Sequence, residues 1–148
     1  MLVNTSRFGQ VEVDDDRVIH FPKGLLGFPR NQRFVLLQPS PESYFYWLQS
    51  MEQAELAFVV TDPSLFVPDY NVPIKADQMA EMGIAKLEEM QVLVIVNKRG
   101  GTLTGNLQGP LVIHTGTRSG EQLVLSDRRW HTRVPLLELG TGAAAISA

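Results

Sequence analysis

The sequence predicts an all-β protein, a small antiparallel β-barrel-like domain of about ten short strands with one short helix. Apolar segments of about strand length recur along the chain, and glycine, proline or aspartate separates one from the next. Convincing helix signals occur in one place only, after Pro73. The 148 residues are enough for one domain that buries its own core.

The first part of the chain is expected to alternate strands with turns. Val11 and Val13 flank the polar Glu12, which is the period of a half-solvated antiparallel strand. The three aspartates of residues 14–16 predict a hairpin turn rather than a cation site, because aspartate bonds its own backbone in turns. The strands expected here span residues 2–5, 8–13, 18–21, 34–37 and the aromatic segment 44–48.

Two unbroken apolar runs, residues 56–60 (LAFVV) and 91–96 (QVLVIV), predict strands that are buried on both faces. A further strand is expected over residues 102–107. Residues 111–115 and 121–125 then predict a hairpin around a glycine-containing turn.

The predicted helix follows Pro73 and is about two turns long. Asp77 is expected to cap its start, and Gly83 followed by Ile84 resembles a left-handed C-cap with its hydrophobic contact. A second short turn is expected over residues 86–89. The side chains expected on the inner side of the helix are Met79, Ala80 and Met82.

Composition and charge narrow the class of protein. The chain has no cysteine, which excludes disulfides and thiolate metal sites and fits a reducing compartment. No signal peptide and no apolar run of membrane-spanning length is present, so we expect a cytoplasmic protein with no membrane partner. The formal net charge of −3 disfavours direct nucleic-acid binding, since the basic residues are scattered until Arg128, Arg129 and Arg133. The domain is expected to span residues 1–137, and residues 138–148, which have few bulky side chains, to form a mobile tail.

The sequence contains no recognisable catalytic, cofactor or metal motif. His20, His114 and His131 share no metal-ligand spacing, and a satisfied or exposed side chain is the commoner outcome for a histidine in an apolar strand. No serine lies in a GxSxG context, and the glycine pair at residues 100–101 is not part of a phosphate-binding loop. We therefore expect no catalytic residues, no cofactor and no metal.

Two proline-flanked loops are unusually apolar, and each has two possible roles. They can close the ends of the barrel, or they can remain open as an anchor patch for a protein partner. The first loop, residues 21–30, carries Leu25, Leu26 and Phe28, and the second, after the buried strand 56–60, carries Leu65, Phe66, Val67 and Tyr70.

Several motifs together resemble the FliW family of flagellar assembly factors. They are GLLGFP at residues 24–29, WLQS at 47–50, LAFVVTDP at 56–63, PDY at 68–70 and NLQGPLVIHTGTRSGEQLVL at 106–125, ending near RVPL at 133–136. The resemblance covers nearly the whole chain in the right order. Departures from the family pattern are Gly109, His114 and Trp130, of which the last two could alter a contact surface.

The resemblance implies a cytoplasmic, non-enzymatic regulator with a β-barrel-like fold and two partners. Family members bind flagellin before its export, and when released they bind the translational repressor CsrA and antagonise it allosterically. The acidic net charge suits a basic RNA-binding partner such as CsrA. As partner-binding residues we expect Leu65, Phe66, Val67, Asp69, Tyr70, Phe28 and Asn106.

Two other functions remain open at this point. One is a small-ligand-binding barrel or unrecognised enzyme, in which the aromatic segment 44–47 would line a pocket. The other is single-stranded nucleic-acid binding on a barrel face, which the charge balance makes the least favoured.

Overall fold

The computed structural model describes residues 1–139, and its secondary structure is dominated by β-strands. The eleven strands are β1 (Leu2–Thr5), β2 (Gly9–Glu12), β3 (Ile19–His20), β4 (Arg33–Leu37), β5 (Phe45–Ser50), β6 (Ala57–Thr61), β7 (Met90–Arg99), β8 (Thr102–Gly105), β9 (Leu111–His114), β10 (Ser119–Gln122) and β11 (Val134–Glu138). One α-helix, α1 (Ala76–Met82), and three 3-10 turns, η1 (Asp15–Arg17), η2 (Pro63–Leu65) and η3 (Leu87–Glu89), complete the described elements. The predicted all-β class is confirmed.

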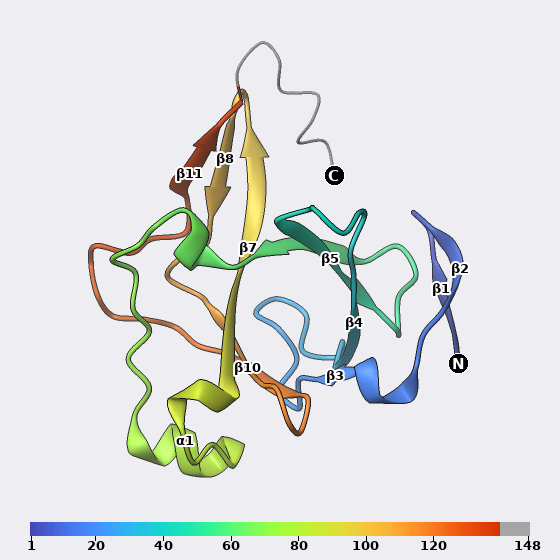
Figure 1. Ribbon diagram of the computed structural model, residues 1–148, viewed down its shortest axis with the longest axis horizontal. Helices are drawn as coiled ribbons and strands as arrows, with labels where there is room; N and C mark the ends of the chain where they lie inside the picture. Colours follow the sequence, from blue (N-terminus) through green and yellow to red (C-terminus); the bar gives the residue numbers. More distant parts are fainter. Residues whose placement is uncertain (140–148) are drawn as a thin grey trace.

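Nine strands form one sheet in the order β11-β8-β7-β6-β5-β4-β3-β10-β9, and a further pairing of β7 with β9 closes seven of them into a ring. The ten-residue strand β7 makes this possible because its first part pairs with β9, its middle with β6 and its end with β8. The end of β7 continues with β8 and β11 as a three-stranded arm, at the top of Figure 1. The ladders are antiparallel, as predicted, except that β3 and β10 pair in parallel through His20 and Ser119.

The N-terminal hairpin β1–β2 is a separate two-stranded sheet. The three aspartates after it do make a turn, but the prediction of a hairpin turn is wrong. Asp15 and Asp16 form the 3-10 turn η1 with Arg17, Asp14 is its N-cap residue, and β2 and β3 lie in different sheets.

The ring encloses the largest apolar cluster, here called the ring core. Six of the seven ring strands contribute to it, and the loop of residues 21–30 covers it with Phe21 and Leu25. Its buried members are Ile19, Phe21, Leu25, Phe34, Leu48, Val60, Leu93, Leu111 and Ile113.

A second cluster, here called the outer core, lies on the other side of β7 and β9. Val94 and Val112 point into it, whereas Leu93 and Ile113, their chain neighbours, point into the ring core. The predicted burial of residues 91–96 on both faces is therefore confirmed. The buried members of the outer core are Ile84, Val94, Leu107, Val112, Leu123, Leu125 and Trp130.

Helix α1 ends as predicted. Gly83 has a left-handed backbone (φ 71°), and the Ile84 amide donates to the Met79 carbonyl oxygen at 2.8 Å while its side chain is buried. The start differs, because Lys75 and not Asp77 is the N-cap residue. Of the expected inner side chains, Met79 and Met82 pack against the outer core, whereas Ala80 is exposed.

Strand β11 extends one residue past the predicted domain boundary at residue 137, and the Leu139 amide donates to the Gly101 carbonyl oxygen at 2.6 Å. Residues 140–148 of the predicted tail lie outside the described residues. Within residues 1–139 we find no helix long and apolar enough to cross a membrane.

Candidate functional site

The loop of residues 62–72, between β6 and α1, contains most of the predicted partner-binding residues. It begins where Asp62 caps η2: one carboxylate oxygen accepts hydrogen bonds from the Ser64 amide at 2.9 Å and from its hydroxyl at 2.7 Å. Pro63 is buried, and the turn places Leu65 in solvent with 53% of its surface exposed. The chain therefore leaves the sheet with a large apolar side chain facing outward.

Phe66 anchors the loop to the three-stranded arm. Its ring stacks on Phe45, with centroids 5.8 Å apart and planes inclined by 27°. It belongs to a third cluster, here called the arm cluster, together with Leu103 and Leu136 from β8 and β11. Phe66 is half-buried, so much of its side-chain surface packs against the arm cluster.

Val67 and Tyr70 anchor the same loop to the outer core. The Tyr70 ring meets Trp130 edge to face, with centroids 5.0 Å apart, and its hydroxyl donates to the Leu107 carbonyl oxygen at 2.7 Å. Burial raises the pKa of the Tyr70 hydroxyl above its ordinary value. These contacts make Val67 and Tyr70 structural supports of the loop, while Asp69 between them is exposed.

A groove of about 240 Å³ separates the loop from η3 and the start of β7. Leu87 in η3 lines it and is 61% exposed, so an exposed leucine projects from each of the two 3-10 turns that flank the groove. The lining is mainly apolar and consists of Asp62, Pro63, Ser64, Tyr70, Asn71, Val72, Leu87, Met90 and Val92. Grooves with a mainly apolar lining are suited to apolar side chains.

The two remaining predicted site residues have structural roles. Asn106 lies next to Leu107, the acceptor of the Tyr70 hydroxyl, and its side-chain oxygen accepts the Gly109 amide at 2.9 Å, which shapes the turn. Phe28 is half-buried and meets Phe58 edge to face at 5.3 Å, against the ring core. Phe28 is not among the residues that line the groove. Its loop lies near the centre of Figure 1, whereas residues 62–72 run along the left of the view.

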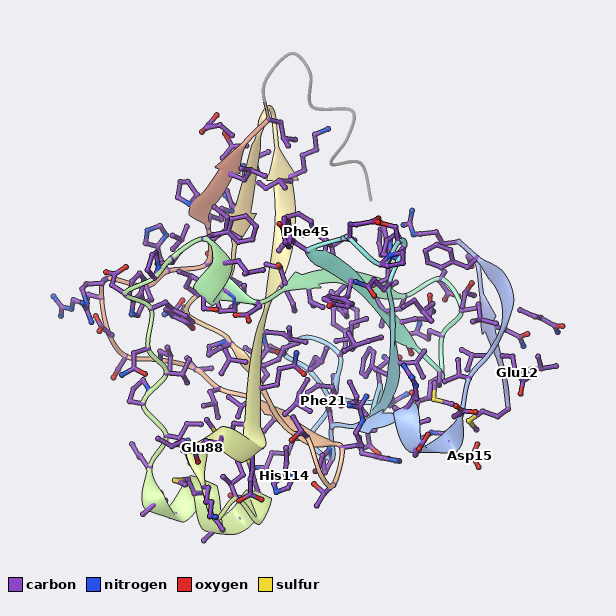
Figure 2. The ribbon with its side chains drawn as sticks, in the orientation of Figure 1. Glu12, Asp15, Phe21, Phe45, Glu88 and His114 are labelled. Carbon is purple, nitrogen blue, oxygen red and sulfur yellow. The ribbon has the colours of Figure 1, made fainter. Side chains whose placement is uncertain are left out.

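His114 has hydrogen-bond partners and His20 is exposed, as expected for these two histidines. His114, labelled in Figure 2, is buried: its Nδ1 accepts the Gly116 and Thr117 amides, both at 3.0 Å, and its Nε2 lies 3.2 Å from a Glu89 carboxylate oxygen. His20 and His131 are exposed. His114 and Trp130, two of the departures from the family pattern, are both buried.

Two residues that the structure brings into view were not singled out from the sequence. Gln49 is fully buried, and its side-chain amide donates to carbonyl oxygens of Ser50, Ala54 and Leu56, holding the loop between β5 and β6 together. A glutamine within an apolar strand segment is the signal in the sequence that could have indicated this buried role of Gln49. Leu87 is the second; a lone leucine among Lys86, Glu88 and Glu89 gives no periodic signal.

Comparison with known proteins shows the family to which this sequence and fold belong. The family model described as FliW protein matches residues 2–136. The chain belongs to the FliW family. A flagellar assembly factor FliW from Alkaliphilus metalliredigens is 36% identical over 141 residues, which cover 93% of this chain and 87% of the relative. One from Leptospira interrogans serogroup Icterohaemorrhagiae serovar Lai is 37% identical over 139 residues, covering 92% and 93%.

The fold agrees with that of a solved family member. A crystal structure of the flagellar assembly factor FliW superposes with a TM-score of 0.84 at 28% sequence identity and covers 93% of this chain and 97% of the other. The closed ring and its arm therefore belong to a fold that this solved flagellar assembly factor shares.

Proposed function

We propose that this chain is a non-enzymatic regulator of flagellar assembly that acts in the cytoplasm. It binds flagellin, and when released from flagellin it binds CsrA and antagonises that repressor allosterically, which controls flagellin synthesis. Membership of the FliW family is the single observation that carries this proposal.

The groove beside residues 62–72 supports a protein partner for this surface. A leucine that is half exposed or more projects from each flank, and the half-buried Phe66 and Tyr70 hold the loop in place without a partner. Preorganised loops lose little conformational entropy on binding, which favours affinity. The lining would suit the apolar side of an amphipathic helix. A flagellin helix would bind in this way, with its apolar side chains in the groove.

The filled interior of the ring argues against the alternative of a small-ligand barrel. Nine buried apolar side chains occupy the ring core, whereas a ligand barrel keeps a cavity with converging polar groups. In the aromatic segment, Tyr44 is 63% exposed, and Trp47 is buried beneath Phe8 and Arg7.

Binding of the purified chain to purified flagellin and purified CsrA tests the proposal. We expect a complex with each protein by size-exclusion chromatography, and loss of the CsrA complex when flagellin is added in excess. The chain alone should not retard RNA in a gel. Failure to bind either protein would contradict the proposal.

A further inference from the structure

The loop that joins β10 to β11 concentrates positive charge on a chain whose net charge is negative. Arg128, Arg129, His131 and Arg133 are all exposed, and three arginines occur within six residues of a chain with formal net charge −3. The loop lies along the left side of the molecule in Figure 1, and side chains tipped with nitrogen gather there in Figure 2.

Contacts with the outer core fix the backbone of this loop. Trp130 is the only buried residue of the segment 126–133, and its ring packs against Tyr70. The His131 carbonyl oxygen accepts the amides of Leu107 at 3.1 Å and Gln108 at 3.3 Å. The arginine side chains therefore project from a rigid support.

Two of the three guanidinium groups have no carboxylate partner. Asp127 binds Arg129, with a carboxylate oxygen 2.9 Å from Nη2, and so neutralises it. Among residues 1–139, Arg128 and Arg133 take part in no ion pair. An exposed arginine without an ion-pair partner presents a planar array of hydrogen-bond donors that matches a carboxylate.

We infer that Arg128 and Arg133 form a binding surface for an acidic segment of a protein partner, adjacent to the loop of residues 62–72. Charge complementarity selects the occupant, since exposed guanidinium groups attract carboxylates and speed association. A nucleic acid is less well matched, because single-stranded binding requires aromatic rings open for base stacking and the Trp130 ring is buried. This surface goes beyond the proposed function, which assigns neither flagellin nor CsrA to it.

Fluorescence anisotropy with synthetic probes tests the inference. The probes are a labelled peptide of Glu-Glu-Ala-Leu repeats, its Lys-Lys-Ala-Leu counterpart and an oligouridine RNA of similar length. We expect the full chain to bind the acidic peptide, with an affinity that falls as sodium chloride is raised. The double variant Arg128→Glu/Arg133→Glu should bind it at least about tenfold more weakly.

The matched control is Arg30→Glu/Lys98→Glu. Both side chains are exposed and take part in no ion pair within the described residues, so this variant has the same net charge as the first without altering the loop. Its affinity for the acidic peptide should stay within about twofold of wild type. Circular dichroism melting of both variants checks that the fold is retained.

Three outcomes would overturn the inference: no binding of the acidic peptide by wild type, equal loss in both double variants, or tighter binding of the RNA or the basic peptide. The first two outcomes leave the proposed function unaffected, since it depends on complexes of the wild-type chain with flagellin and CsrA. Tight RNA binding would count against both, because the proposed function expects that the chain alone does not bind RNA. Conversely, if the chain binds the acidic peptide but neither flagellin nor CsrA, the proposed function is contradicted and the inferred binding surface is supported.

Discussion

Two loops of similar composition have different roles in this molecule. Residues 21–30 and residues 62–72 both carry large apolar side chains between prolines. The first loop is a lid on the ring core: Leu25 is 3% exposed, and the Leu26 amide donates to the Gln122 side chain at 2.8 Å. Lys23 ties this lid to Glu81 and Glu121 at the surface.

The second loop is anchored at two points and open between and beside them. Phe66 packs on the arm cluster and Tyr70 on the outer core, while Leu65 and Asp69 face solvent. Neighbouring elements therefore decide which apolar side chains of a loop pack against the core and which remain exposed to a partner. Variants of the two loops test that division, from the largest expected effect to the smallest.

Gly24→Ala should damage the lid most. Gly24 has φ +68°, and an added Cβ would lie 2.6 Å from both the Phe28 carbonyl oxygen and Pro29 Cα. Because backbone must move, we expect a loss of about 3 kcal/mol or more in urea unfolding. Gly27→Ala is the matched control, with φ +84° and open space around the new Cβ, and should cost only about 1–2 kcal/mol. Equal losses would mean that the lid is not tightly packed at Gly24.

Tyr70→Ala should destabilise the fold by about 2–4 kcal/mol, because it removes a half-buried ring and leaves the Leu107 carbonyl oxygen without its donor. Tyr44→Ala, at a side chain that is 63% exposed, should change stability by less than about 0.5 kcal/mol. Thermal unfolding of both variants gives the comparison. A near-zero effect at Tyr70 would make it part of the open surface.

The raised pKa of Tyr70 predicts a loss of stability at alkaline pH. The unfolded chain releases this proton at the ordinary tyrosine value, near pH 10, whereas the folded chain retains it to higher pH. Stability is therefore full below about pH 10 and falls as pH rises above it, by at most about 1.4 kcal/mol per unit. Tyr70→Phe should flatten that part of the stability profile in urea titrations between pH 9 and 11. An unchanged slope would show that other groups cause it.

Leu65→Asp and Leu26→Asp should have the smallest effects on stability, within about 0.5 kcal/mol, since the two side chains are 53% and 58% exposed. Their effects on binding should differ. We expect Leu65→Asp to weaken the complex with flagellin by about tenfold and Leu26→Asp to leave it unchanged, by isothermal titration. The reverse order would assign the contact to the lid.

Much of the fold could be predicted because it depends on local patterns. The apolar runs of β6 and β7 and the Gly83–Ile84 helix end follow from burial and backbone geometry within a few residues. Strand β11 was not predicted, because Pro135 interrupts it and its pairing partner β8 lies about thirty residues earlier in the chain. The parallel pairing of His20 with Ser119 is likewise a long-range contact with no local signal.

The candidate site was predictable only in part. Residues 62–72 were identified from their composition, but Phe28 belongs to the other loop and Leu87, across the groove, was missed. The turns η2 and η3 lie close together because β6 pairs with β7. The distance between them along the sequence therefore gives no indication of this proximity.

The sequence by itself determined the β class, the apolar strand that leads to residues 62–72, and the family, because alternation, apolar runs and motif order are properties of the chain. The strand is less buried than predicted, since only Val60 of residues 56–60 is fully buried. Only the tertiary structure decided which apolar side chains of the loop face inward. Trp130, Leu107 and Phe45 come from distant elements, and by covering Tyr70 and Phe66 they leave Leu65 exposed beside a groove.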